Sequence, residues 1–144
     1  MMDVPEEVSE SFPSDDGSML LQYLGKNPEL RVIDFLLENT LFDFSKKEIL
    51  EEIGMSKSTL YRILPKLLRM EIIRITRRIG KAPLYQINVE SPVVKDLWNI
   101  EKTLILLNNI RHTSEEPSVK SEMSLTEKYY LLAEEGSILK DHDL

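Results

Sequence analysis

The sequence predicts a mainly α-helical fold that carries one small antiparallel β-hairpin. Between residues 26 and 69, three segments place apolar residues at helical spacing, and each begins at a residue that caps helix N-termini. Two alternating, β-branched runs follow at residues 72–78 and 84–88, and the glycine and proline between them indicate a hairpin. A longer apolar stripe over residues 91–111 predicts a final, long helix.

Charge is distributed unevenly along the 144 residues, whose formal net charge is −7. Residues 57–81 hold eight Lys or Arg and a single acid, Glu71, whereas residues 1–25 and 113–144 carry net charges of −6 and −5. A basic body between acidic ends is typical of a protein that binds a polyanion through its folded part. We therefore expect one domain with acidic, solvated termini.

The composition disfavours a catalytic or metal-binding role. The chain has no cysteine, which excludes disulfides and thiolate metal sites, and His112 and His142 are far apart in the sequence. It has no glycine-rich phosphate loop and no nucleophile with a partner base. We expect no cofactor, no metal site and no enzymatic activity. The chain also lacks a secretory signal and an apolar run of about 20 residues, so we expect a cytoplasmic protein that does not enter a membrane.

An acidic N-terminal segment precedes the first helix of the domain. Residues 1–25 are rich in acids and serine, so we expect them to be largely disordered, with a short helix at residues 19–24. Asn27 and Pro28 then provide an N-cap and a first helical residue, which predicts a helix to about Glu38. Its core-facing residues are Leu30, Ile33, Leu36 and Leu37.

A second helix follows a short alternating run, Phe42-Asp-Phe, which could add one short strand to the hairpin. Ser45-Lys-Lys-Glu48 is a capping box, in which each side chain satisfies a free backbone N–H group. Gly54 is able to adopt the left-handed conformation that ends such a helix. The inward-facing residues are Ile49, Leu50 and Ile53.

The third helix, at residues 57–69 with Ser56 as its cap, has an apolar side and a basic side. Its apolar side is formed by Leu60, Ile63, Leu64 and Leu67. Ser58, Arg62 and Arg69 lie opposite, flanked by Tyr61 and Lys66. Pro65 removes one backbone hydrogen bond, at a typical cost of about 3 kcal/mol unless a kink absorbs it. A bend there could curve the helix or shorten its outward-facing part, and the sequence leaves both outcomes open.

The hairpin and the long helix complete the predicted domain. The five residues 79–83 between the two β-branched runs predict a loop too long for a two-residue turn. The apolar side of the long helix spans about half its circumference, more than the roughly 100° that one small core claims. We therefore expect a homodimer in which a second copy covers this helix. The predicted dimerisation residues are Val94, Leu97, Trp98, Leu104 and Ile105.

Residues 112–144 form an acidic tail that contains a second capping box, Ser124-Leu-Thr-Glu127. It predicts a short helix at residues 125–135, whose apolar side suits docking on the chain's own domain, on a second subunit or on another protein.

The order of these motifs resembles the winged helix-turn-helix transcriptional regulators. The likeness rests on Gly54-Met-Ser-Lys-Ser-Thr-Leu-Tyr-Arg-Ile-Leu, on a basic strand, and on Gly80-Lys-Ala-Pro-Leu-Tyr. It covers about residues 26–110 and is greatest to the ArsR/MarR-type superfamily, in the compact single-domain form common in archaea. The resemblance implies a winged helix-turn-helix domain at residues 26–90, followed by a long dimerisation helix at residues 91–111. It also implies that the third helix enters a major groove and that the hairpin, or wing, contacts the adjacent backbone or minor groove.

The same resemblance implies which residues contact DNA. Arg62 is the first candidate for a base contact, because a guanidinium can bond O6 and N7 of guanine together. Lys57, at a helix start, suits a phosphate, and the basic wing residues suit phosphates or a minor groove. The predicted DNA-binding residues are Lys46, Lys47, Lys57, Ser58, Thr59, Tyr61, Arg62, Lys66, Arg74, Arg77, Arg78 and Lys81.

Two functions from different classes fit the sequence. The first is a sequence-specific, double-stranded DNA-binding regulator of transcription that acts as a homodimer. The alternative is a winged-helix adaptor that binds other proteins in a transcription or replication assembly. Tyr61 fits either the core edge or a groove contact, whereas Tyr85 is expected to pack under the wing.

Overall fold

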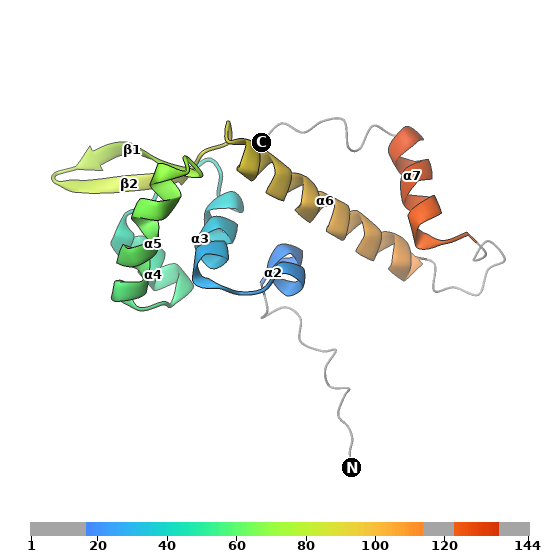
Figure 1. Cartoon of the computed structure of the whole chain (residues 1–144), viewed down its shortest axis with the longest axis horizontal. Helices are drawn as coiled ribbons and strands as arrows, with labels where there is room; N and C mark the ends of the chain where they lie inside the picture. Colours follow the sequence, from blue (N-terminus) through green and yellow to red (C-terminus); the bar gives the residue numbers. More distant parts are fainter. Residues whose placement is uncertain (1–16, 114–122, 136–144) are drawn as a thin grey trace, which may run out of the picture.

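The computed structural model describes residues 17–113 and 123–135 of the chain. The disorder predicted for the first residues, and most of the acidic tail, lie outside this part. The elements are α2 (Met19–Leu24), α3 (Pro28–Leu37), α4 (Lys46–Ile53), α5 (Lys57–Arg69), β1 (Ile73–Ile79), β2 (Ala82–Ile87), α6 (Pro92–Thr113) and α7 (Leu125–Glu135) (Figure 1). The fold is mainly helical with one two-stranded antiparallel sheet, as a winged helix-turn-helix requires, and the predicted fold class is confirmed.

The helix boundaries follow the capping residues that the sequence predicts. Asn27 Oδ1 accepts the Leu30 N–H at 2.8 Å and begins α3. The capping box at the start of α4 is complete, because Ser45 N–H donates to Glu48 Oε1 at 2.8 Å while Glu48 N–H donates to Ser45 Oγ at 3.1 Å. Gly54 ends α4 at φ 77° and ψ 41°, a left-handed conformation that strains most other residues.

The core lies where α2, α3, α4, α5, the hairpin and the start of α6 meet. The side chains that are fully buried there include Leu20, Val32, Leu36, Ile49, Leu60, Ile73 and Val94. Each aliphatic side chain removed from water in this way contributes about 1.5–3 kcal/mol. The apolar side predicted for α5 is the side that is buried, so its polar side faces outward.

The hairpin is tighter than the sequence predicts. Ile79 pairs with Ala82, so only Gly80 and Lys81 form the turn and the predicted five-residue loop is wrong. Gly80 has φ 65°, and of these two turn residues it alone has a positive φ, as in a type II′ turn. Pro83, which the sequence placed in the loop, lies within β2 because a two-stranded ribbon has edges that tolerate a missing N–H group.

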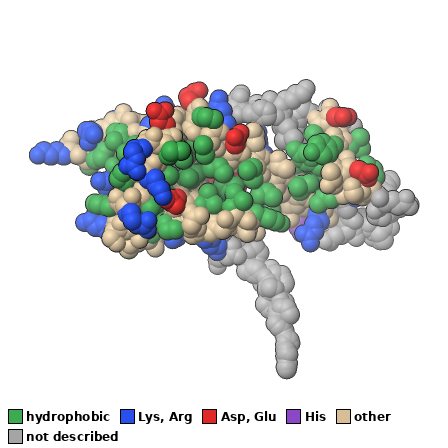
Figure 2. All heavy atoms as spheres, viewed as in Figure 1, with side chains coloured by type: hydrophobic (Ala, Val, Ile, Leu, Met, Phe, Trp, Pro, Cys, Tyr) green, Lys and Arg blue, Asp and Glu red, His purple; other side chains and the backbone are tan. Residues whose placement is uncertain are grey.

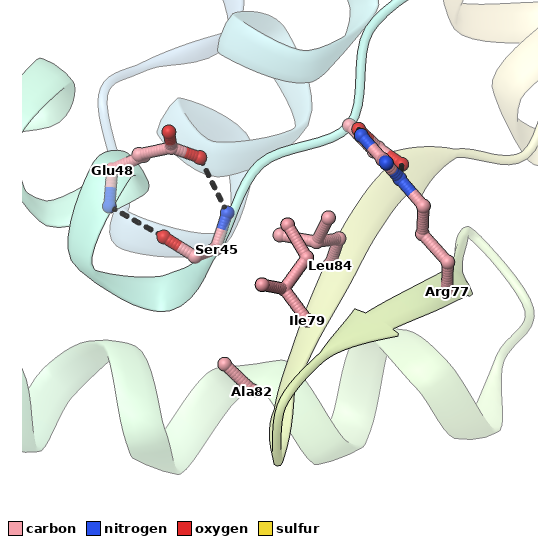
Figure 3. A pocket seen from close by; sticks show the side chains of 7 residues that line it. Ser45, Glu48, Arg77, Ile79, Ala82 and Leu84 are labelled. Carbon is pink, nitrogen blue, oxygen red and sulfur yellow. Dashed lines mark hydrogen bonds and ion pairs between the residues drawn. The ribbon is translucent and has the colours of Figure 1, made fainter.

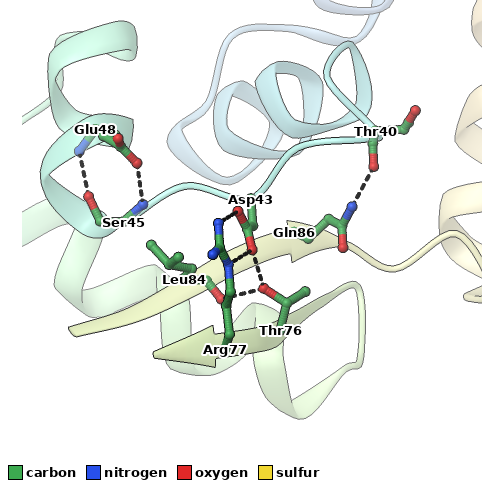
Figure 4. A network of polar contacts seen from close by, with 8 residues as sticks. All are labelled: Thr40, Asp43, Ser45, Glu48, Thr76, Arg77, Leu84 and Gln86. Carbon is green, nitrogen blue, oxygen red and sulfur yellow. Dashed lines mark hydrogen bonds and ion pairs between the residues drawn. The ribbon is translucent and has the colours of Figure 1, made fainter. Parts of the chain in front are cut away.

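A third stretch of chain pairs with the hairpin. Phe44 N–H donates to the Tyr85 carbonyl and Tyr85 N–H donates to the Phe44 carbonyl, each at 2.8 Å. This single bridge is the short strand predicted from the Phe42-Asp-Phe pattern, reduced to one residue pair. Gln86 Nε2 also donates to the Thr40 carbonyl at 2.7 Å (Figure 4). The base of the wing is therefore fixed to the loop between α3 and α4.

The apolar side of α6 is covered within the chain more than the sequence predicts. Both α2 and α7 pack against α6, which runs away from the hairpin end of the molecule (Figure 1). Thr103 Oγ1 and the Tyr129 hydroxyl approach to 3.5 Å between α6 and α7. Ile100 and Ile105 nevertheless remain 41% and 42% exposed. Within the described residues, none of the helices combines the length and apolarity needed to cross a bilayer.

Candidate functional site

The polar side of α5 forms the centre of a cationic surface. Ser58 and Arg62 are exposed there, one turn apart, near the N-terminal end of the helix. The Ser56 cap accepts the Thr59 N–H at 3.1 Å and donates to the Thr59 hydroxyl at 2.8 Å. Thr59 is half-buried and bonded to its cap, whereas Arg62 and Ser58, whose Oγ lies 3.4 Å from Ser56 Oγ, are the exposed groups of this turn.

Tyr61 links α5 to the start of α4. Its ring is 43% exposed, and Lys46 Nζ and Lys57 Nζ lie 4.5 and 5.5 Å from the ring centroid. Each lysine can gain a cation–π interaction of about 0.5–1 kcal/mol at such an exposed site. The sequence left Tyr61 between the core and the surface, and the structure places it on the surface, between two cations.

The wing presents further cations beside α5. Along β1 only Ile73 is buried, and every residue from Arg74 to Ile79 is exposed. The pairing register shifts between Ile75 and Arg77, which re-aims the side chains that follow. Figure 2 shows Lys and Arg side chains gathered at the end of the molecule that carries the hairpin, α4 and α5.

Arg77 differs from the other wing cations because it is bonded to a carboxylate. Its Nε and Nη2 donate to the two oxygens of Asp43 at 2.9 and 3.1 Å, and the Thr76 hydroxyl donates to the same carboxylate at 2.5 Å (Figure 4). These bonds, with Arg77 as the largest cause, lower the pKa of Asp43 to about 2. The predicted DNA contact of Arg77 must therefore compete with Asp43.

Lys66 is the second predicted contact that already has a partner. Its ammonium forms an ion pair with Glu29 of α3, and the two side chains are 51% and 31% exposed. Exposed pairs of this kind contribute little to stability, about 0–1 kcal/mol. Pro65 precedes it without interrupting α5, which continues to Arg69 as one helix. Lys66 and Arg77 are weaker candidates for DNA contacts than the sequence predicts.

The remaining cations of this surface have no carboxylate partner among the described residues. Within residues 17–113 and 123–135, no ion pair is found for Lys46, Lys47, Lys57, Arg62, Arg74, Arg78 or Lys81. They come from α4, from α5 and from the wing. We call these seven residues, with Ser58 and Tyr61, the cationic surface.

A cavity of about 290 Å³ lies between the wing and the start of α4 (Figure 3). Ile79 and Leu84 supply its apolar wall, while Glu48 and Arg77 contribute polar groups that are already bonded to Ser45 and Asp43. Because its polar groups are satisfied within the chain, this hollow offers a ligand little that would orient it.

The predicted dimerisation residues do not share one exposed face. Val94 is fully buried in the chain's own core and cannot contact a partner, so its assignment is wrong. Leu97 and Trp98 are half-buried against the same core, and Leu104 is also half-buried. Ile105 is the most exposed of the set. The error arises because α2 and the core occupy part of the stripe that the sequence assigned to a second subunit.

Sequence reasoning missed two acidic residues. Asp43 lies in a loop and is brought to Arg77 only by the pairing of Phe44 with Tyr85, which no local pattern reveals. Glu101 lies on α6, and its side chain is only 7% exposed and points toward α3. The sequence does contain a signal for Glu101, because this acid interrupts an otherwise apolar side of its helix.

No protein-family model matches the chain, and no curated protein matches it. One solved structure, the crystal structure of M. tuberculosis Rv0081, aligns with a TM-score of 0.46 and 20% sequence identity, over 78% of this chain and 100% of that chain. The fold assignment rests on the elements and pairings described above.

Proposed function

We propose that this protein is a double-stranded DNA-binding regulator of transcription that acts as a homodimer and has no catalytic role. The observation that carries the proposal is the cationic surface. Exposed Lys and Arg from α4, α5 and the wing gather at one end of the molecule, and no described carboxylate neutralises them. Positive charge concentrated on a protruding helix and hairpin matches the regular phosphate charge of a duplex.

In this proposal α5 enters the major groove. Arg62 lies on the outward side of the helix, where its guanidinium can bond the O6 and N7 atoms of guanine, and Ser58 lies one turn before it. Lys46 and Lys57, held beside Tyr61, would contact the phosphates at the start of the helix. These contacts would fix the register in which Arg62 meets the bases.

The wing would hold the adjacent backbone. Arg74, Arg78 and Lys81 are exposed along β1 and at the turn, and the bridge between Phe44 and Tyr85 fixes the root of the hairpin. A ribbon held in this way can place cations on phosphates or in a minor groove without ordering a flexible loop on binding. We therefore propose that these residues supply affinity and that Arg62 supplies sequence preference.

A protein-binding adaptor is the second candidate, and one observation favours it. Tyr130, Leu131 and Leu132 of α7 are 61%, 49% and 37% exposed, more apolar surface than a short helix usually leaves to water. This surface belongs to α7 and not to the cationic surface. A protein partner there is therefore compatible with DNA binding at the other end.

A salt titration of duplex binding tests the proposal. If DNA is bound by the cationic surface, the logarithm of the association constant falls with the logarithm of salt concentration, by about 0.9 per phosphate neutralised. After selection of bound duplexes from a random pool, Arg62→Ala should cost about 1–3 kcal/mol on the preferred sequence and little on others. Arg78→Ala should weaken binding to all sequences alike.

Arg111→Ala is the matched control, because Arg111 is exposed at the far end of α6. It removes the same charge and should leave affinity unchanged. No duplex binding at low salt, or equal losses from Arg62→Ala and Arg111→Ala, would overturn the proposal and favour the adaptor.

A further inference from the structure

Three carboxylates meet where α3 packs near α6. Asp34 and Glu38 lie one turn apart on α3, Glu101 comes from α6, and one oxygen of each lies within 4.8 Å of the others. Asp34 and Glu101 are only 5% and 7% exposed, whereas Glu38 is exposed at the edge. Acids are rarely buried without a partner, so this cluster needs an explanation.

The strongest sign is the Glu101 side chain. Its Oε1 atom is buried, and among the residues that the structure describes no group donates a hydrogen bond to it. A buried carboxylate oxygen that has lost its water without gaining a donor is strongly disfavoured. Glu101 lies on the same side of α6 as Leu97 and Trp98. A leucine at this position would fill the space without burying a carboxylate oxygen that lacks a donor.

Asp34, one of the other two carboxylates, is already positioned by a hydrogen bond. The Ser18 hydroxyl, at the start of α2, donates to Asp34 Oδ1 at 2.5 Å and orients that side chain. Burial, together with the neighbouring charges of Asp34 and Glu38, raises the pKa of Glu101 to about 7. Burial likewise raises the pKa of Asp34, against the opposing Ser18 hydrogen bond, and that of Glu38.

A cavity of about 400 Å³ adjoins the cluster and gives it access to water. Glu38, Glu101 and Thr40 line it together with Trp98 and Lys102, whose ammonium lies 5.6 Å from the Trp98 ring centroid. The cavity offers further oxygen atoms and space for bound water on the open side of the carboxylates. Carboxylates, one neutral oxygen and water form a ligand set for a hard cation.

We propose that Asp34, Glu38 and Glu101 bind a hard divalent cation of the Ca²⁺ class. The site suits Ca²⁺ better than Mg²⁺, because Ca²⁺ accepts irregular oxygen geometry whereas Mg²⁺ demands a near-ideal octahedron. The three carboxylate oxygens, all within 4.8 Å of one another, are close enough to share one such cation. The absence of sulfur and imidazole from the set disfavours softer metals. The cation would join α3 to α6 and does not depend on DNA binding.

Calorimetry and thermal unfolding of the full-length, EDTA-treated protein test the site. We expect CaCl₂ to bind with a stoichiometry of one and to raise Tm as its concentration increases, as any ligand of the folded state does. Glu101→Gln should weaken Ca²⁺ binding at least about tenfold, as loss of a ligand or its support does. Glu38→Gln is the second variant, because an exposed side chain can be changed without unfolding the protein. Asp96→Asn, exposed on the same helix, is the matched control.

Terbium provides a readout specific to this location. Tb³⁺ replaces Ca²⁺ at oxygen sites, and its luminescence is sensitised by a nearby tryptophan. Trp98 is the single tryptophan of the chain and lines the same cavity. Excitation of Trp98 should therefore produce Tb³⁺ emission that CaCl₂ displaces and that Glu38→Gln or Glu101→Gln abolishes.

Several results would overturn the proposal. They are no saturable Ca²⁺ binding, equal binding by the parent and both variants, and a Tm increase that NaCl at equal ionic strength reproduces. The second result would place the cation on other acids of the chain, and the third would indicate charge screening alone.

Discussion

The molecule gathers like charges in two regions, and the regions differ in how far those charges are exposed to water. At the hairpin end, the cations of the cationic surface lie close together on α4, α5 and the wing, and all of them reach water. At the joint between α3 and α6, three carboxylates lie within 4.8 Å, and two of them are almost fully buried. Like charges gather in both places, but burial shields two of the three carboxylates from the water that screens the cations.

The difference indicates how strongly each region needs a ligand. Two unit charges 4.8 Å apart repel by less than about 1 kcal/mol in water but by about 3 kcal/mol at the effective dielectric of a partly buried site. Repulsion between the exposed cations therefore lowers the stability of the folded state little, even when no polyanion is bound. The buried carboxylates must bind a proton or a cation, or the folded state loses stability.

The largest predicted effect is on the pH dependence of unfolding in the presence of EDTA. The folded state holds the Glu101 proton up to a pKa of about 7, whereas the unfolded chain releases it near 4.5. Between these values the unfolded state binds fewer protons, so the free energy of unfolding falls as pH rises and levels off above pH 7. We expect a loss on the order of 1–3 kcal/mol from this group.

Glu101→Gln should remove that loss. Urea unfolding of the variant and the parent should give similar stabilities near pH 4.5 and a more stable variant at pH 8. Asp34, Glu38 and Lys102 also face this region, so a residual slope in the variant belongs to them. A parent protein whose stability does not fall between pH 5 and 7 would show that the buried carboxylates are neutralised in another way.

The predicted dimer contact involves the part of α6 that the rest of its own chain leaves exposed. Ile105 is 42% exposed, whereas Val94 is buried in the core. If a second copy packs on the exposed side, Ile105→Glu should raise the dimer dissociation constant at least tenfold, about 1.4 kcal/mol, because it places a charge in an apolar contact. Sedimentation equilibrium measures this change. A monomeric parent protein would refute the prediction, and Lys95→Gln, at an exposed position of the same helix, controls for the same change of one negative charge unit.

A smaller effect is expected at the one wing cation that is held by an acid. Asp43→Asn keeps the shape of the side chain but frees Arg77 and removes a negative charge beside the cationic surface. We expect duplex affinity to rise about two- to fivefold at low salt, since an ion pair of this kind is weak and the lost carboxylate no longer repels the phosphates. The salt slope should become steeper by about 0.9 if Arg77 reaches a phosphate.

The Asp43 pair also has its own acid dependence. Because the folded pKa of Asp43 lies near 2, below its usual 3.8, the stability it contributes is present above about pH 4 and is lost as pH falls toward 2. Asp43→Asn should lack this acid-dependent component. Glu90→Gln, an exposed acid without such a bond, should retain it and leave duplex affinity unchanged.

Local signals in the sequence predict the helices well and their packing poorly. Asn27, Ser45, Ser56 and Gly54 mark helix ends through bonds to neighbouring backbone groups, so three or four residues contain the whole signal. The buried side of α5 follows from its 3.6-residue period for the same reason. The turn at Gly80 was predicted to be too long, because a proline such as Pro83 usually indicates a loop. Proline is tolerated in a strand only where the strand has an open edge, and the sequence does not show that edge.

Long-range partners could not be predicted in this way. The pair of Asp43 with Arg77 spans 34 residues, and Glu101 meets Asp34 across 67. Val94 was assigned to a dimer contact because a stripe of apolar residues does not say which parts its own chain will cover. The cations of α5 and the wing were predictable from the composition, but the pairing of Lys66 with Glu29 and of Arg77 with Asp43 required the fold.

The smallest effect is expected at Glu71, which joins α5 to the wing. It has φ 60°, in the left-handed region that strains a residue with a Cβ, and it is the single acid within residues 57–81. Glu71→Asn relieves part of that strain, because asparagine tolerates this conformation, and should stabilise the fold by up to about 1 kcal/mol. Glu71→Gln removes the same charge but keeps the strain. Both variants should therefore bind duplex slightly more tightly, and only Glu71→Asn should raise Tm. Equal Tm values for the two variants would mean that the backbone at this junction carries no strain and that charge alone distinguishes Glu71 from its basic neighbours.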